Sequence, residues 1–259
     1  TAKTDGTYLY VLKDKSNQIA IIDTRDNRMK QTATITVEDV SEIQEMYLDI
    51  ERNQLIAVCD GYVGGKWNDD DYGYGQRANT TAVTYDISDR ENPKEVGRVS
   101  QSGYYNSSRI ADGYLYLFSD YYVTLDGITA KNPKSYIPLV NDNLIKETDI
   151  CLPSISKADM YSIITSVSLE NPNETAHSKA LLADGGNLYV SNDNIYFYEN
   201  VWQYSGKDVT TIRKVSYESG KLTAGAQCKI DGYINDSFSI DEYDGYLRVV
   251  VTDGDTNSV

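Results

Sequence analysis

The chain has 259 residues, with 24 Lys and Arg against 39 Asp and Glu, so its formal net charge is −15. A protein that follows phosphate groups needs a basic face, and this balance therefore excludes nucleic acid and anionic membrane surfaces as favoured partners. No apolar run approaches the ~18 residues of a membrane-spanning helix, which excludes membrane insertion of this segment. A hydrophobic fraction of 40% is typical of a folded globular chain.

The aromatic content is unusual, because 23 Tyr stand against 3 Phe and 2 Trp. Tyrosine suits half-buried pleated surfaces, so this surplus favours β structure. The cysteines are odd in number and widely spaced, which excludes a disulfide framework and a CxxC motif. We expect Cys59, Cys151 and Cys228 to be small buried side chains, with Cys59 in the alternating stretch LIAVCD as the best example.

A repeated unit becomes visible along the chain. Its first element is an alternating Tyr/Leu/Val strand that follows a DG, RN or GG turn signal, as in a β-hairpin. We take Leu9, Leu55, Leu115, Leu188 and Leu247 as equivalent positions of this element, in DGTYLYVLK (5–13), ERNQLIAVCD (51–60), DGYLYLFSD (112–120), GGNLYVSND (185–193) and DGYLRVVVTD (244–253).

The second half of the unit repeats as strand, polar turn, strand, with turns that carry DN, ENP, NPN and SG. Its copies lie at 18–37, 82–100, 164–182 and 212–230. A short polar segment before each first element supplies a fourth strand. The segment 37–50 has apolar residues at near-helical spacing, but its place directly before a repeat strand favours an extended structure.

This pattern predicts an all-β fold, a β-propeller of four-stranded antiparallel blades, with four complete blades and part of a fifth in 1–259. Two units are longer than common propeller repeats, because they carry insertions at 61–80 and 121–160. Each insertion lies between the second and third strands of its unit, so we expect both to emerge on one face of a single domain, where function usually resides. The chain stops just after an apolar β-like run, so we expect it to be a fragment of a larger propeller.

The chain resembles secreted bacterial proteins that carry a C-terminal β-propeller domain. The matching stretches are AKTDGTYLYVL, TAVTYDISDRENPKEVG, SSRIADGYLYLFSD, TSVSLENP with GGNLYVSNDNIYFYEN, and SFSIDEYDGYLRVVVTDG. In that family the last motif more often reads like QFSMDEYNG, so Ile240 and Asp244 depart conservatively. The resemblance implies further blades after Val259, an export signal or anchor before Thr1, and an extracellular or cell-surface location. It implies no reaction.

The acidic run NDDDYGYG (68–75) in the first insertion offers carboxylate oxygens to a hard cation. The spacing differs from the EF-hand pattern, so a solvated acidic loop is the main alternative to a calcium site at Asp69, Asp70 and Asp71. No other cofactor is indicated.

Propellers bind ligands at the mouth of the central channel, which the innermost strand of each blade lines. We assign QEMYL, NSSRI, SKALL and DSFSIDE to those strands, which brings Ser107, Arg109, Ser237, Ser239, Asp241 and Glu242 toward the axis. Arg109 with Asp241 or Glu242 forms either a buried ion pair that fixes blade packing or part of a ligand site. A pair of catalytic carboxylates, as in a glycosidase, is a further alternative.

Aromatic side chains in the insertions resemble a sugar- or peptide-binding surface. They are Trp67, Tyr72 and Tyr74 in the first insertion and Tyr121, Tyr122 and Tyr136 in the second. The single histidine, His177, fits a surface turn better than a catalytic triad. We therefore expect an extracellular binding or scaffold module with a carbohydrate or protein ligand, rather than an enzyme. The alternatives are a glycan-active enzyme with channel-mouth carboxylates and a purely structural domain.

Overall fold

The chain folds almost entirely into β-strands. The computed structural model describes residues 1–25, 29–62, 78–123, 131–152, 158–183, 187–201, 208–254 and 256–258. No helix in these ranges is long and apolar enough to cross a membrane. The segment 37–50, which we expected to be extended, contains strand β5.

Four sheets follow one another along the chain, and each is built on four antiparallel strands in sequence order. Short additional strands extend the second sheet to six strands and the third to five. The first contains β1 (Ala2–Thr4), β2 (Tyr8–Leu12), β3 (Gln18–Asp23) and β4 (Lys30–Thr36). The second contains β5 (Glu42–Asp49), β6 (Gln54–Tyr62), β7 (Ala78–Asp86) and β8 (Lys94–Ser102). The third contains β9 (Tyr104–Ala111), β10 (Tyr114–Tyr122), β14 (Met160–Ser168) and β15 (Thr175–Ala183). The fourth contains β16 (Asn187–Val190), β17 (Asn194–Val201), β18 (Val209–Glu218) and β19 (Lys221–Asp231).

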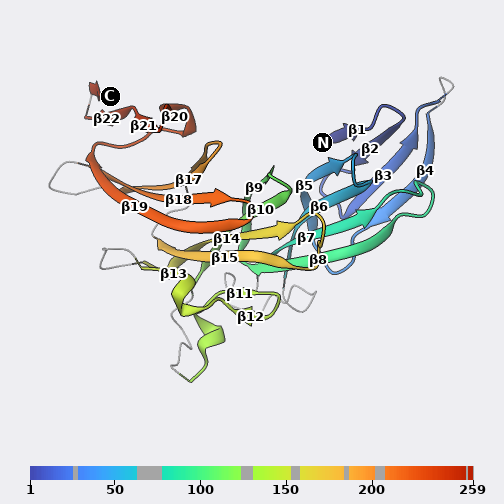
Figure 1. Ribbon diagram of the computed structural model, residues 1–259, viewed down its shortest axis with the longest axis horizontal. Coiled ribbons are helices and arrows are strands. Elements are labelled where there is room, and N and C mark those ends of the chain that lie inside the picture. Colours follow the sequence, from blue (N-terminus) through green and yellow to red (C-terminus); the bar gives the residue numbers. More distant parts are fainter. Residues whose placement is uncertain are drawn as a thin grey trace.

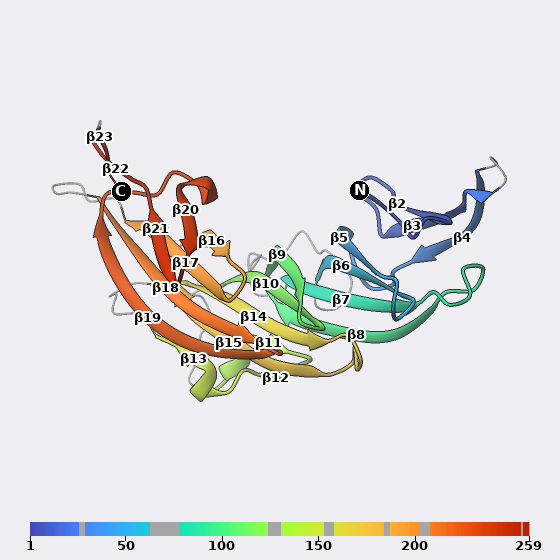
Figure 2. The ribbon, with the colours of Figure 1, turned by 45° about the horizontal axis from the view of Figure 1, so that its top comes forward.

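A smaller sheet follows the fourth and pairs β20 (Ile240–Tyr243) with β21 (Tyr246–Val249), after the short 3-10 helix η5 (Ser237–Ser239). A last hairpin joins β22 (Val251–Asp253) to β23 (Thr256–Ser258). The sheets succeed one another along an open arc (Figure 1). The first strands β5, β9, β16 and β20 lie toward its concave side, and β8, β15 and β19 lie toward its convex side (Figure 2).

Neighbouring sheets pack face to face, so a strand in the middle of the arc buries both of its faces. In β6, Leu55 and Cys59 face the first sheet, whereas Ile56 and Val58 face the third. The alternation follows from the two-residue period of a strand. Two further apolar clusters join the third sheet to the fourth, and the fourth to β20 and β21. The core is therefore divided into layers between successive sheets.

Cys59 is buried, as predicted, and its burial raises the pKa of the thiol to about 12. The expectation was wrong for Cys228, which is exposed on the outer strand β19, and Cys151 is only half-buried. The outermost strand of a sheet is covered by other elements on one face at most, so the residues on its other face can be exposed to solvent.

A polar clasp fastens one sheet to the start of the next, and it occurs twice with the same geometry. The Asp60 carboxylate at the end of β6 accepts the Tyr105 backbone N–H at 2.7 Å, and the Asn200 amide at the end of β17 accepts the Ile234 N–H at 3.1 Å. Both N–H groups lie two residues after a glycine of positive φ, Gly103 or Gly232. The pattern thus repeats with a carboxylate in one copy and a neutral amide in the other.

The threonine opposite each clasp residue completes it. Thr80 faces Asp60 across the sheet and Thr210 faces Asn200. The two hydroxyls donate to the Gly103 carbonyl at 3.0 Å and to the Gly232 carbonyl at 2.8 Å. A side chain at Gly103 would place its Cβ 2.6 Å from the Asp120 carbonyl, so the close approach of the chain requires glycine there.

The insertion at 121–160 starts from β10 and ends at β14, the second and third strands of its sheet, as predicted. It carries the 3-10 helices η3 (Pro133–Ser135) and η4 (Glu147–Asp149) and the strands β11 (Leu139–Val140), β12 (Asn143–Leu144) and β13 (Ile150–Cys151). Strand β11 pairs with β8 of the second sheet, and β13 pairs in parallel with β15 of the third. The insertion therefore ties the outer edges of two sheets together. Of the other insertion, 63–77 lies outside the described residues.

The repeat alignment was wrong in the fourth unit. Leu188 lies in β16, the first strand of its sheet, whereas Leu9, Leu55, Leu115 and Leu247 lie in second strands. Likewise SKALL belongs to β15, the outermost of the four strands of the third sheet, and does not face the concave side. The error arose because β16 and β17 both follow a turn signal and both alternate, so either one matches the template.

We predict that Asp60→Asn preserves the fold, since the Asn200 clasp already uses an amide. Its free energy of unfolding at pH 7 should lie within about 1 kcal/mol of wild type in urea titrations, whereas Asp60→Ala, which leaves the Tyr105 N–H unpaired, should cost about 1–3 kcal/mol. The exposed Gln44 amide, which donates to Asp60 at 2.9 Å, can turn to accept instead.

The pH dependence of stability provides a second test of the Asp60 variants. Burial raises the pKa of Asp60, so in wild type ionisation costs more in the folded than in the unfolded state. That cost is present at pH 7 and disappears as the pH falls below the unfolded pKa of ~3.9. Any gain in the free energy of unfolding of Asp60→Asn over wild type should therefore shrink as the pH is lowered. An equal loss of stability in the Asn and Ala variants would contradict the clasp.

Candidate functional site

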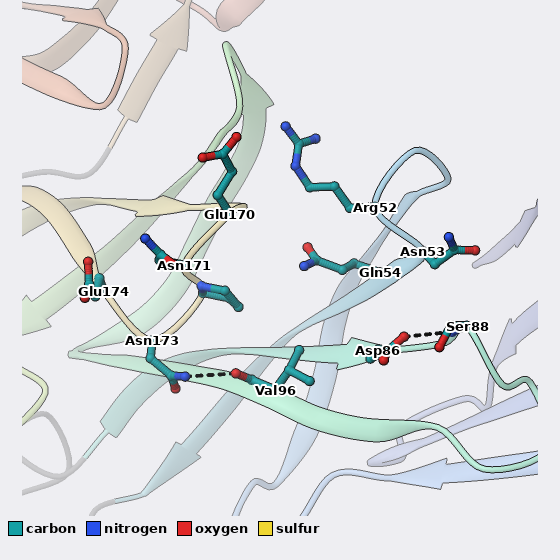
Figure 3. Close-up of a pocket in the computed structure, with 11 residues that line it drawn as sticks. Arg52, Asn53, Gln54, Asp86, Ser88, Val96, Glu170, Asn171, Asn173 and Glu174 are labelled. Atoms are coloured by element: carbon teal, nitrogen blue, oxygen red, sulfur yellow. Dashed lines mark hydrogen bonds between the residues drawn. The ribbon is translucent and has the colours of Figure 1, made fainter.

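A polar cleft of about 610 Å³ lies between the second and third sheets (Figure 3). One wall is the turn between β5 and β6 together with the end of β7 and part of β8. The other wall is the turn between β14 and β15. The lining residues are Arg52, Asn53, Gln54, Asp86, Ser88, Val96, Glu170, Asn171, Pro172, Asn173 and Glu174. Its volume falls within the range of small-ligand sites.

The wall contributed by the third sheet is held rigidly. The Ser168 hydroxyl accepts the backbone N–H groups of Glu170 and Asn171 at 3.2 and 3.3 Å, which shapes the start of the turn. The Asn173 side chain accepts from the Arg98 N–H at 3.2 Å and donates to the Val96 carbonyl at 2.8 Å. These two bonds fasten the turn to β8 of the neighbouring sheet.

Apolar contact reinforces the same attachment. Pro172 is buried and lies so close to Gly97 that a Cβ at Gly97 would come within 2.5 Å of the proline ring. Only glycine allows this approach. The two walls of the cleft are therefore joined at its floor, and the cleft is preformed.

The wall contributed by the second sheet depends on ionic contacts. Arg52 pairs with Asp49 at 2.9 Å, and Asn53, at a positive φ of 52°, accepts from Arg90 at 3.0 Å. Arg90 also pairs with Asp5 of the first sheet at 3.1 Å. A hydrogen bond from the Ser88 backbone lowers the pKa of Asp86, so this carboxylate is ionised at the edge of the cleft.

A second cavity, of about 390 Å³, lies between β9, the fourth sheet and the segment before β20. Ser107 and Ser237, which the sequence placed near the axis, both line it, together with Asn106, Asn187, Leu188, Tyr198, Asn235 and Asp236. Its wall consists mainly of amides and hydroxyls.

Arg109, Asp241 and Glu242 are not brought together as an ion pair. Arg109 donates to the Val190 carbonyl at 3.3 Å and to the Asn192 side chain at 3.4 Å. Asp241 pairs instead with Arg248 on the adjacent strand, and both side chains are more than half exposed. The two neighbours in β20 point to opposite faces of their strand, which separates Asp241 from Glu242.

Glu242 serves as a connector between sheets. Its carboxylate accepts from the amide of Asn194, the first residue of β17, at 2.7 Å and from the hydroxyl of Ser191, in the segment that joins β16 to β17. Burial together with this carboxylate raises the pKa of Tyr196. Arg109 and Glu242 thus contact the same segment from two sides, the first from the third sheet and the second from β20.

The remaining candidates divide into two groups. Trp67, Tyr72 and Tyr74, and the carboxylates Asp69, Asp70 and Asp71, lie outside the described residues, so the calcium site stays a prediction. Within the described part of the chain, no group of three His, Cys, Asp or Glu side chains is arranged to hold a metal ion.

Two tyrosines assigned to the second insertion belong to strand β10. Tyr121 is buried in the layer between the second and third sheets, and Tyr122 is half-exposed at the end of the strand. Because β10 is longer than its DG-initiated motif suggested, Tyr121 contributes to the core rather than to a loop surface.

His177 lies in β15, not in a surface turn, and both of its ring nitrogens have partners. Nδ1 accepts the Leu222 backbone N–H at 3.0 Å, so the proton resides on Nε2, which faces the Asp149 carboxylate at 3.3 Å. Burial would raise the pKa of Asp149, but hydrogen bonds from Lys179 and His177 outweigh it and lower the pKa. His177 links the insertion, the third sheet and the fourth, and no nitrogen is left to take a proton from a nucleophile.

Sequence reasoning missed the cleft in Figure 3, although two of its signals are visible in the sequence. The NPN turn was recognised only as a turn, and Gly97 was not singled out. The contact between Pro172 and Gly97 joins positions far apart in the chain, so it depends on the packing of two sheets.

Comparison with known proteins identifies the family. A model of the β-propeller domain family matches residues 1–259. The chain belongs to the β-propeller domain family. No curated protein matches it.

Among solved structures, the propeller chain is similar to the WD40 domain of Toxoplasma gondii coronin, at 8% identity and a TM-score of 0.41. The match covers 88% of this chain and 44% of that one, so the chain spans less than half of the coronin structure. It is also similar to a functionally unknown protein of Desulfotomaculum acetoxidans, at 11% identity and a TM-score of 0.28, with coverage of 92% and 71%.

We predict opposite outcomes for the two neighbouring carboxylates of β20. Glu242→Ala should lower the free energy of unfolding by about 1–3 kcal/mol, because it leaves the Asn194 amide without its acceptor and removes one of the two acceptors of the Ser191 hydroxyl. Asp241→Ala removes the same charge from an exposed pair and should cost about 1 kcal/mol or less. Urea titrations of both variants provide the measurement. A larger loss in the Asp241 variant would show that Glu242 is not the connector.

Proposed function

We propose that this chain forms four complete blades and the start of a fifth in an exported bacterial β-propeller, which serves as a binding or scaffold module at the cell surface. The family match supports the architecture. The four sheets, each built on four antiparallel strands, and the two-stranded sheet that follows them support the proposed blade count. The secreted location rests on the resemblance in the sequence, and the strongly acidic charge of −15 suits a soluble extracellular domain.

The observation that carries the binding role is the preformed cleft between the second and third sheets. Its walls are joined by Asn173 and by the contact of Pro172 with Gly97, so little conformational entropy is lost when a ligand enters. Its rim carries side chains from two separate turns, which is the usual position of binding residues on a rigid scaffold. We propose that a carbohydrate or protein ligand binds here.

A glycan-active enzyme with carboxylates at the concave face is less favoured. Glu242 is engaged by two donors within the protein, and Asp241 is paired with Arg248. Neither carboxylate is arranged as a general acid opposite the other. A purely structural domain would bind no ligand. A ligand-binding experiment therefore distinguishes this alternative from a binding module.

We predict that Asn171→Trp blocks the cleft without unfolding the protein. Asn171 is exposed, and its turn contacts use the backbone, so the indole replaces only a solvated amide. Saturation-transfer NMR with a mixture of oligosaccharides and short peptides should show ligand signals for wild type that weaken in the variant. Glu218→Trp, at an exposed position in the β18–β19 hairpin, is the matched control. Signals that are absent or equal in all three proteins would refute the module.

A further inference from the structure

One polar atom of the cleft lacks a partner. The side-chain oxygen Oε1 of Gln54 is buried and accepts no hydrogen bond from the described residues. Gln54 lines the cleft, and Figure 3 shows its amide directed into the space between the two walls. A buried acceptor without a donor is unfavourable, and native proteins retain few of them. Gln54 as a whole is only partly buried, so a turn of its amide can present this oxygen to a donor from a molecule in the cleft.

The groups around it combine donors and acceptors on both walls. Glu170 and Asn171 stand on the third-sheet wall, opposite Arg52 and Gln54 on the second-sheet wall (Figure 3). A hydroxyl group donates and accepts through the same oxygen, whereas an ammonium group only donates and a carboxylate only accepts. A polyhydroxyl molecule can therefore satisfy the mixture on both walls with one kind of functional group.

The charges that line the cleft restrict the class of ligand further. The lining holds three carboxylates, of Asp86, Glu170 and Glu174, against the single guanidinium of Arg52. That guanidinium already pairs with Asp49. An anionic sugar would meet net repulsion, so a neutral one is favoured. Val96, which is 38% exposed, adds apolar surface against which the C–H face of a sugar ring can pack.

We infer that the cleft binds a neutral oligosaccharide, with the Gln54 oxygen accepting a hydrogen bond from a sugar hydroxyl. This inference rests on the proposed binding function and names its ligand class and one specific contact. Glu170, Asn171 and Arg52 hold further hydroxyls at the rim. A cationic peptide is the competing ligand, because the three carboxylates could also attract it.

Isothermal titration calorimetry with defined probes tests the inference. The neutral probes are maltohexaose, cellohexaose, mannohexaose and chitohexaose; hexagalacturonate is the anionic probe and hexalysine the cationic peptide. We expect at least one neutral oligosaccharide to bind wild type and hexagalacturonate not to bind. Gln54→Met, which keeps the length of the side chain but removes its acceptor, should weaken that binding about three- to tenfold.

The same variant provides a readout that does not depend on the ligand. Since it removes a buried acceptor without a partner, Gln54→Met should keep or raise the melting temperature of the free protein while it weakens binding. The matched control is Gln31→Met in β4, an exposed position outside the cleft, which should change neither property.

Three results would contradict the inference, and they differ in whether the proposed binding function survives. If hexalysine binds, Asn171→Trp abolishes its binding and no neutral oligosaccharide binds, the cleft belongs to a cationic peptide. If neutral oligosaccharides bind equally well to the Gln54→Met protein, the assigned contact is wrong. If no probe of any class binds, and Asn171→Trp changes nothing, the proposed function fails together with the ligand.

Discussion

Face-to-face packing of successive sheets is the constraint on which the rest of this structure depends. A sheet in the middle of the arc must be apolar on both sides, as Ile56 and Val58 on one face of β6 and Leu55 and Cys59 on the other demonstrate. Hydrophobic contact has no preferred direction, however, and two flat apolar faces could slide past each other. The relative position of the sheets therefore has to be fixed by polar groups at their ends.

Those polar groups are side chains that accept or donate backbone hydrogen bonds across a junction. Asp60 and Asn200 do so at the connections that follow β8 and β19, and Asn173 does so between the second and third sheets. Glu242 instead accepts from the Asn194 side chain and so attaches the last pair of strands to the fourth sheet. Each is directional, and each saturates a backbone or side-chain group that would otherwise be buried alone. One wall of the cleft is one of these junctions, so the same residues fix the shape of the cleft and the relative position of the two sheets.

The architecture was predictable from the sequence because short-range patterns of residues indicate its strands and turns. Alternation with a two-residue period, DG turns and strand-turn-strand repeats identified second strands such as β2, β6 and β10. Where two neighbouring strands carry the same signals, as β16 and β17 do, the local pattern could not tell them apart. The error at Leu188 is thus a limit of periodicity itself.

The candidate site was not predictable in the same way, because its residues come from turns that meet only after folding. Gln54 begins a strand and Glu170 belongs to a turn in the next sheet, and nothing in either local sequence indicates the other. Charged residues gave misleading hints, since Arg109 and Asp241 have the right chemistry for a pair but point to different partners. Strand geometry places Asp241 and Glu242 on opposite faces. It shows which of the two can pair with Arg109 only once their strand is assigned.

The contrast between paired and unpaired polar groups gives the cleft its significance. The amides of two junction residues are paired through both oxygen and nitrogen: Asn200 bonds to the Ile234 N–H and carbonyl, and Asn173 bonds to two backbone groups of β8. Gln54 has the same chemistry in a buried position, yet its oxygen is left without a donor among the described residues. Among the described residues, Asn79 Oδ1, Gln101 Oε1 and Arg90 Nε are also buried without a partner, but these three residues do not line the cleft and Gln54 does. At the cleft, a ligand that donates a hydrogen bond would satisfy the open acceptor.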